Sequence, residues 1–193
     1  HHAQHLLADP LHAPPSTILL LALRHPLLPA PALVPSYPNP MVLPLHYHYL
    51  APPSLSSKLN IPHCTKMALV HDMAEALVGD ITPVDGVAKH EKNRRESTTM
   101  DYFTKSLLGR VNGGISGDEI KAVWQEYEDS ETPESQFVHD VDKIELILQM
   151  VEYERIHERK LDLGEFSWVA TRIVMPEVKA WSDELLKERE EFW

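Results

Sequence analysis

The chain has 193 residues, enough for one domain with a sizeable core, and its 43% hydrophobic and 24% charged residues are ordinary for a globular protein. A net charge of −11 argues against nucleic acid as a partner, because proteins that bind its phosphate backbone usually carry a basic stripe. The sequence contains no run of 18 apolar residues, so we expect no membrane span.

The first 50 residues differ in composition from the rest. Ten of the 16 prolines lie within the first 44 residues, where Asp9 and Arg24 are the only charged side chains. Proline breaks helices, so we expect residues 1–50 to be an irregular Pro-rich segment that is not part of the native fold. The hypothesis is that it derives from non-coding sequence or a misjoined exon, which continuous transcript coverage of codons 49–53 would refute. No basic region precedes its apolar core, so we expect no secretory leader.

The remainder, residues 51–193, is predicted to form one helical domain. Helices are expected at 62–78, 86–108, 117–129, 131–158, 165–174 and 176–193, with a flexible loop at 111–117. Gly79 is a natural stop for the first helix, and Thr132 and Pro133 are suited to begin the fourth. No convincing alternating strand is present, so the predicted fold class is all-α.

The single cysteine, Cys64, lies within the first of these helices. A lone cysteine cannot form an internal disulfide, which fits a reducing compartment, and we expect the cytoplasm or the nucleus. No nucleophile motif surrounds it, so we expect a buried structural thiol.

The stretch ALVHDMAEALVGDITP, residues 68–83, carries the first candidate site. Residues three and four apart share one face of a helix, so His71, Asp72 and Glu75 should cluster, with Asp80 just past Gly79. Imidazole and carboxylate together suit first-row divalent metals, and buried carboxylates without a counter-charge are costly. The sequence therefore indicates a metal site, with a solvated acidic helix end as the alternative.

The stretch FVHDVDKIELILQM, residues 137–150, carries the second candidate. Asp142 lies between Val141 and Ile144 on the predicted apolar stripe, whereas Asp140 lies at least 100° away from it and is expected to face solvent. Asp142 is either a further metal ligand or one half of a buried salt bridge, with Lys143 or with an arginine of the 86–108 helix.

Four motifs in order carry a resemblance to a known family: MALVHDMAEALVGDITP, EKNRRE, VWQEYE and DKIELILQMVEYE. Together they resemble the HD superfamily of metal-dependent phosphohydrolases. Within that superfamily they are most similar to the eukaryotic HD domain-containing protein 2 group, relatives of the bacterial 5′-deoxynucleotidases. The likeness covers about residues 51–193.

The resemblance implies an all-α HD-domain bundle that hydrolyses deoxynucleoside 5′-monophosphates to deoxynucleoside and phosphate, with Mn²⁺, Co²⁺ or Mg²⁺ as cofactor. It implies that one metal ion is bound by His71, Asp72 and Asp142. It further implies that a second ion is bound by Glu75, Asp80 and the main-chain carbonyl of Ile81.

With one metal ion, the resemblance instead implies that Glu75 orients or deprotonates the attacking water and that Asp80 contacts the sugar. Arg94 and Arg95 lie on the neighbouring helix. Either arginine could bind the substrate phosphate, although a solvated helix face is the alternative role for both.

The chain departs from the family at one ligand. The family has a further histidine before the segment equivalent to Leu50, and Pro40 stands where it should be. His46 and His48 point to opposite faces of an extended chain, so at most one of them could replace it. We therefore expect weakened metal binding and impaired activity.

Two other functions stay open: another HD-type nucleotide phosphohydrolase or phosphodiesterase, and a catalytically inactive helical scaffold. The resemblance favours a homodimer. Aromatic residues near the end of the chain could support one, with simple capping of the core as their alternative role: Phe166, Trp168, Trp181, Phe192 and Trp193.

Overall fold

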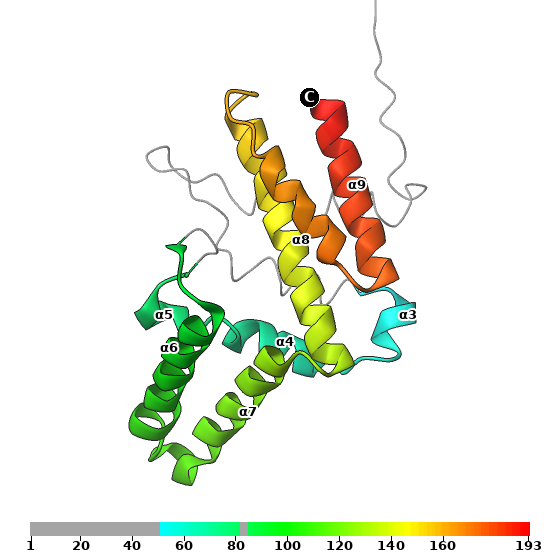
Figure 1. The fold of residues 1–193 in the computed structure, drawn as a ribbon. Helices are drawn as coiled ribbons and strands as arrows, with labels where there is room; N and C mark the ends of the chain where they lie inside the picture. Colours follow the sequence, from blue (N-terminus) through cyan, green and yellow to red (C-terminus); the bar gives the residue numbers. More distant parts are fainter. Residues whose placement is uncertain (1–50, 82–84) are drawn as a thin grey trace, which may run out of the picture. The chain divides into compact units, whose positions relative to one another are not determined.

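A computed structural model describes residues 51–81 and 85–193, so the predictions for the Pro-rich segment, His46 and His48 lie outside it. Every regular element in these two ranges is a helix, which confirms the all-α prediction (Figure 1). The described chain divides into two compact units, residues 51–142 and residues 143–193. The boundary falls within one long helix, residues 133–156.

The 51–142 unit contains most of the short elements. In chain order these are α3 (Pro53–Ser56), α4 (Ile61–Val70), α5 (Glu75–Val78), α6 (Lys89–Asp101), the π-helical η3 (Tyr102–Leu107), the 3-10 turn η4 (Val111–Gly114), α7 (Ile115–Asp129) and the start of α8 (Pro133–Ile156). Lys121 of α7 joins α6, since its Nζ lies 3.2 Å from Asp101 Oδ1 and 3.3 Å from the Ser97 carbonyl oxygen. The two helices therefore lie side by side (Figure 1).

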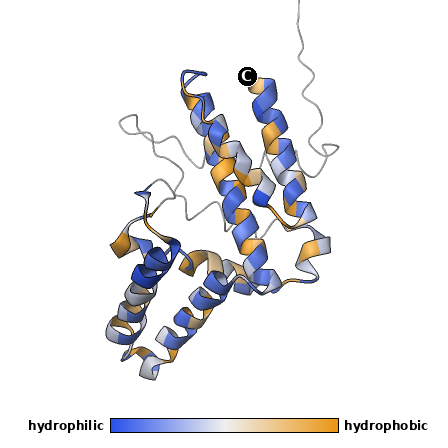
Figure 2. Ribbon diagram, in the orientation of Figure 1, coloured by the Kyte–Doolittle hydropathy of each residue, from blue (hydrophilic) through white to orange (hydrophobic). Residues whose placement is uncertain are grey.

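Apolar side chains from α4, α6, α7 and α8 form the core of this unit. The buried members include Cys64, Met67, Met100, Val123, Trp124, Phe137, Val138 and Val141. Helix α6 contributes little to it and is hydrophilic over most of its length (Figure 2). Burial raises the pKa of the Cys64 thiol to about 12, which confirms the prediction of a buried structural cysteine.

A glycine allows α7 to begin earlier than predicted. Residues 111–117 were expected to form a loop, but α7 starts at Ile115. A Cβ at Gly117 would lie 2.3 Å from the backbone oxygen of Thr104, so only glycine permits this approach between α7 and η3. Asn112, Gly113 and Gly114 precede it with positive φ values of 50°, 67° and 90°.

Helix α8 begins as the sequence predicts. The Thr132 hydroxyl accepts a hydrogen bond from the Ser135 amide at 3.1 Å and donates one to Glu126 Oε1 at 2.7 Å, and Pro133 is the first helical residue. All residues of the predicted apolar stripe are buried: Phe137, Val138, Val141, Ile144, Ile147, Leu148 and Val151.

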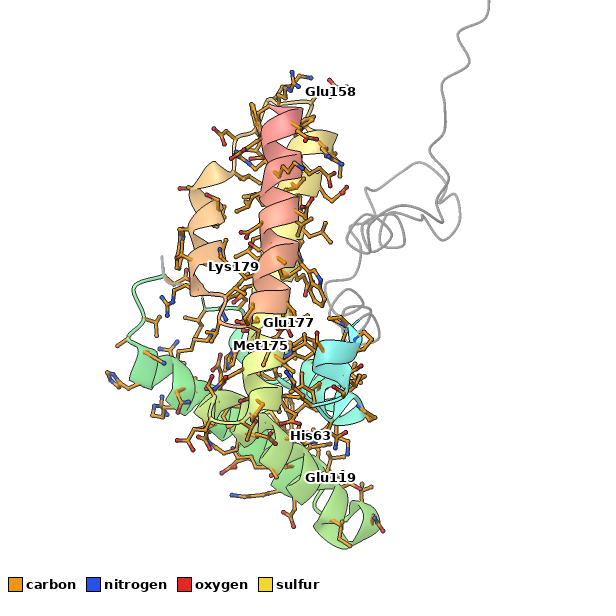
Figure 3. The ribbon with its side chains drawn as sticks, turned by 90° about the vertical axis from the view of Figure 1, so that its right-hand side faces the viewer. His63, Glu119, Glu158, Met175, Glu177 and Lys179 are labelled. Carbon is orange, nitrogen blue, oxygen red and sulfur yellow. The ribbon has the colours of Figure 1, made fainter. Side chains whose placement is uncertain are left out.

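The 143–193 unit consists of the rest of α8, the 3-10 helix η5 (Gly164–Arg172) and α9 (Pro176–Phe192). Figure 3 marks the turn after α8 at Glu158, where Glu158 and Arg159 have φ values of 51° and 64°. The Glu154 carboxylate of α8 pairs with Arg189 of α9, and Arg155 pairs with Glu188. Within the described residues, no helix is both long enough and apolar enough to cross a membrane.

Candidate metal centre

The predicted helix over 62–78 is divided where the candidate site begins. The side chain of Asn60 caps α4 by accepting a hydrogen bond from the His63 amide at 3.2 Å. The helix ends at Val70, residues 71–74 form turns, and α5 covers only Glu75–Val78. As predicted, Gly79 ends the helical segment, with a φ of 76° that a residue with a Cβ rarely adopts.

The ring of His71 explains the break. Its Nδ1 lies 2.9 Å from the carbonyl oxygen of Ala68, which is the acceptor that the Asp72 amide would use in a continuous α-helix. The α-helical ladder stops at this position, and Met73 and Glu75 instead bond to the carbonyls of Val70 and Asp72, three residues back.

The same hydrogen bond decides which nitrogen of His71 is left for a ligand. A carbonyl oxygen only accepts, so Nδ1 carries the proton and Nε2 is the free ligand atom. Nε2 is buried and has no hydrogen-bond partner. It lies 3.0 Å from Asp72 Oδ2, outside hydrogen-bond geometry, and 3.9 Å from Asp142 Oδ1.

A buried nitrogen facing two carboxylates favours a positive charge. Burial alone would lower the pKa of His71, but Asp142 and Asp72 outweigh it and raise that pKa to about 10. A proton or a metal ion can provide the charge, and metal binding at such a nitrogen displaces the proton. One nitrogen and two carboxylates suit a first-row divalent ion.

The three side chains do not already form a coordination shell. Within residues 51–81 and 85–193, no group of three or more His, Cys, Asp or Glu side chains is arranged to hold a metal ion. The carboxylates of Asp72 and Asp142 contact the His71 ring itself rather than a shared point. The residues fit a metal by chemistry, and a divalent ion would require the two carboxylates, both about half exposed, to turn.

The two aspartates of α8 have the reverse of their expected exposure. Asp140 was predicted to face solvent, and this is wrong, because it is buried with 1% of its surface exposed. Asp142 was placed among core residues, yet 47% of its side chain is exposed and its carboxylate faces His71. Helix α8 is covered on more than one face here, since Ser135 and Asp140 are buried along with the apolar stripe.

Glu75, Asp80 and Ile81 lie around the end of α5, but a lysine rather than open space lies between them. Lys92 of α6 donates a hydrogen bond to the Ile81 carbonyl at 3.2 Å, and its Nζ lies 3.6 Å from Glu75 Oε1 and 3.4 Å from Glu96 Oε1. Asp80 is exposed. Burial, followed by the charges of Asp72 and Asp80, raises the pKa of Glu75 to about 7, against the opposing effect of Lys92.

Arg94 and Arg95 are exposed and already paired. Arg94 donates two hydrogen bonds to Glu91, at 2.7 and 2.9 Å, and Arg95 donates one at 2.8 Å. These bonds, that from Arg94 foremost, lower the pKa of Glu91 to about 2. The contacts favour the alternative interpretation, a solvated helix face.

Three residues of the candidate site were not predicted from the sequence: Lys92, Tyr127 and His139. The Tyr127 ring packs against His71 with 4.8 Å between centroids and stacks on His139 at 3.9 Å. Tyr127 lies within the VWQEYE motif, so the sequence carried a signal for this residue. His63, by contrast, pairs with Glu126 at 2.7 Å and takes no part in the His71 cluster.

The HD domain family matches residues 45–181 of this chain. The chain belongs to the HD-domain family. Its relatives include 5′-deoxynucleotidase hdd1 of Schizosaccharomyces pombe, 47% identical over 70% of this chain and 68% of the relative. They also include 5′-deoxynucleotidase HDDC2 of Homo sapiens, 38% identical over 68% of this chain and 63% of the relative.

A solved structure of an HD-domain protein has a related fold. It is HD domain-containing protein YGK1, with a TM-score of 0.64, 32% identity and coverage of 79% of this chain and 75% of that one. A curated relative of the same name, 5′-deoxynucleotidase YGK1, comes from Saccharomyces cerevisiae. The matched region spans between 57% and 70% of the curated relatives' own length.

Proposed function

We propose that this HD-domain chain is a metal-dependent 5′-deoxynucleotidase that releases phosphate from deoxynucleoside 5′-monophosphates. One observation carries the proposal: the buried Nε2 of His71 has no hydrogen-bond partner and faces the carboxylates of Asp72 and Asp142. A buried imidazole nitrogen that faces two carboxylates is a donor set that suits a first-row divalent ion. The names of the curated relatives supply the substrate class.

Each residue has a stated part in this proposal. His71, Asp72 and Asp142 would hold a divalent ion, with Mn²⁺, Co²⁺ and Mg²⁺ as candidates. Such an ion supplies Lewis acidity that offsets the negative charge of the phosphate. Glu75, with its pKa of about 7, can accept a proton from the attacking water near neutral pH, and the exposed Asp80 would contact the sugar.

Among the described residues, no set of His, Cys, Asp or Glu side chains already forms a coordination shell, and this favours one competing function, a helical scaffold without catalysis. The family's further histidine would fall within residues 1–50, outside the described part of the chain. Loss of one ligand weakens metal binding, since even losses outside the ligand shell typically cost about 10–100-fold in affinity. We therefore propose that this chain is a weak enzyme rather than an inert one.

Metal content and phosphate release separate these functions. The full chain, Asp72→Asn and the matched surface control Asp129→Asn would be tested with Mn²⁺ on dAMP, dCMP, dGMP and dTMP. We expect Asp72→Asn to lose bound metal and at least about 100-fold in release, with Asp129→Asn unchanged. Equal metal in the parent and Asp72→Asn would refute the site, and a metal-loaded parent without release would support the scaffold.

The absence of the family's further histidine, where Pro40 stands, has its own test. Replacing residues 1–49 with a helix that carries the family's histidine should raise turnover, because the other proposed ligands and Glu75 remain in place. A restored chain that is inactive on every nucleoside monophosphate would refute the deoxynucleotidase proposal. If the parent is as active as the restored chain, His46 or His48 supplies the ligand.

We also propose a homodimer in the cytoplasm or nucleus. Phe166, Trp168 and Trp193 are 39%, 54% and 42% exposed, respectively, which supports an apolar contact in the 143–193 unit. Light scattering that gives a monomer near 22 kDa at high concentration would contradict the dimer.

A further inference from the structure

Lys92 occupies the place where the family resemblance puts a second metal ion. Three oxygen atoms surround its Nζ: the Ile81 carbonyl at 3.2 Å, Glu96 Oε1 at 3.4 Å and Glu75 Oε1 at 3.6 Å. Two of these three, those of Glu75 and Ile81, belong to the residues that a second ion would need. Two of the three donors expected to bind a second metal ion therefore already lie around a cation of the chain itself.

The distances are those of an ammonium group and not of a metal ion. A divalent ion such as Mg²⁺ binds oxygen at about 2.0–2.1 Å, and Ca²⁺ at about 2.3–2.6 Å. For an ion to bind there, Glu75 and the Ile81 carbonyl would have to close on a point that the lysine now fills. The positive charges of the ion and of the Lys92 ammonium group would also repel each other strongly in a half-buried environment.

The chain holds Lys92 firmly in this position. Glu96 lies one helical turn after Lys92 on α6 and is buried, with 6% of its surface exposed, so its carboxylate requires a nearby positive charge. Burial opposes the charge of Lys92, but the carboxylates of Glu96 and Glu75 outweigh it and raise the lysine pKa. Moving the ammonium away would leave the Glu96 carboxylate buried without this partner.

We propose that Lys92 replaces the second divalent ion in this chain, so that the Glu75, Asp80 and Ile81 group binds none and Lys92 fixes the position of Glu75. Lys92 is then a positioning residue. The inference deepens the proposed function, because it leaves one divalent ion, at His71, Asp72 and Asp142, and assigns Glu75 to the water rather than to a metal.

Counting bound Mn²⁺ tests the proposal without any assay of activity. The full chain would be titrated with Mn²⁺ while the electron paramagnetic resonance signal of the free ion is recorded. Lys92→Met removes the charge at nearly constant length, and Lys89→Met is the matched control from the exposed start of the same helix. Melting followed by circular dichroism establishes that each variant is folded.

We expect Lys92→Met to bind one more ion than the parent, at Glu75, Glu96, Asp80 and the Ile81 carbonyl, and Lys89→Met to match the parent. Adding Glu75→Gln to Lys92→Met should remove the extra ion. Equal counts in the parent and a folded Lys92→Met would overturn the proposal.

The number of ions bound by the parent chain alone provides a second test, which does not depend on how Lys92→Met folds. A parent that binds two ions, one of them lost in Glu75→Gln, would overturn the proposal, and a parent that binds one or none supports it. Failure of the proposed function gives a different result: a parent that binds no ion at the His71 cluster. The role of Lys92 is judged from the difference in bound ions between the parent and Lys92→Met, and that difference does not depend on how many ions the parent binds.

Discussion

Two buried charged clusters, one in each unit, are satisfied to very different degrees. In the 143–193 unit, the fully buried Glu154 accepts four hydrogen bonds: from the Leu163 amide, from Arg189 twice and from the Trp193 indole, at 2.7–2.9 Å. In the 51–142 unit, the buried Nε2 of His71 has no hydrogen-bond partner. A carboxylate with every acceptor site filled stabilises a fold, whereas a nitrogen that faces two carboxylates can exchange its proton for a metal ion.

The comparison predicts that substitutions in the two units affect different properties. Changes around Glu154 should lower stability and leave the chemistry of a folded chain intact. Substitution of Glu75 should do the reverse, because burial already disfavours its charged form and raises its pKa to about 7. Loss of His71 should impair metal binding and also remove stability at alkaline pH, because Asp142 and Asp72 raise its pKa to about 10.

The largest effect is expected at Glu75. Glu75→Gln keeps the size of the side chain but removes the proton acceptor, and general bases typically contribute about 10²–10⁴-fold to rate. We expect phosphate release from dAMP to fall by about that factor while the urea midpoint of unfolding stays the same or rises. A variant that keeps full turnover would remove Glu75 from the reaction.

The next effect is on stability and concerns Glu154. Glu154→Gln leaves the Arg189 guanidinium, itself only 18% exposed, without its main buried counter-charge. Breaking a buried ion pair in this way typically costs about 3–5 kcal/mol. The urea midpoint should therefore drop steeply, and the turnover per folded molecule should not change.

Asp162→Asn is the matched control for that variant. Asp162 also contacts Arg189, at 2.7 Å, but 70% of its side chain is exposed. Surface pairs contribute about 0–1 kcal/mol, so the midpoint should barely move. If both substitutions lowered the midpoint equally, burial would not explain the role of Glu154.

The two clusters should lose their contributions at opposite ends of the pH scale. Burial opposes ionisation of Glu154, but Arg189, Trp193 and the Leu163 amide outweigh it and lower its pKa. Its contribution is therefore present above the ordinary value of 4.5 and is lost as the pH falls through the lowered pKa. The pKa of His71 is raised to about 10, so its contribution is complete below 6.5 and is lost as the pH rises through 10.

Melting of the metal-free chain from pH 3 to pH 10 measures both contributions. In a plot of melting temperature against pH, Glu154→Gln should flatten part of the acid limb. His71→Gln should flatten part of the alkaline limb of the same plot. The pKa of Glu75 is raised to about 7, so its contribution to stability is lost as the pH rises from 4.5 to 7. The effect of His71 is therefore measured above pH 7.5, where Glu75 is already ionised. An alkaline limb that is unchanged in His71→Gln would contradict the raised pKa of His71.

The sequence was sufficient for features that depend on neighbours along one helix. The apolar stripe of α8, the Thr132 cap and the stop at Gly79 follow from spacing and residue type, and the structure confirms them. The positions of His71 and Asp72 on one segment were likewise predictable.

Features that depend on a second element escaped prediction. Asp140 was placed in solvent because one apolar stripe was assumed, whereas α8 is covered more widely there. The break at His71 is different, because it depends on a side chain that bonds to a carbonyl of its own helix, which residue spacing does not indicate. Lys92 bonds to the Ile81 carbonyl from the next helix, α6, and no spacing rule connects those two positions.

The smallest effect is expected at Arg94 and Arg95, which were predicted as candidate phosphate ligands. Both guanidinium groups are exposed, at 64% and 44%, and both bind Glu91. Exposed pairs of this kind are screened by salt and contribute little. We expect Arg94→Gln and Arg95→Gln to leave the melting temperature and the KM for dAMP unchanged at 0.15 M salt. A KM that rises in one variant at constant kcat would assign that arginine to the substrate phosphate, and binding would then extend from the buried His71 cluster to the surface of α6.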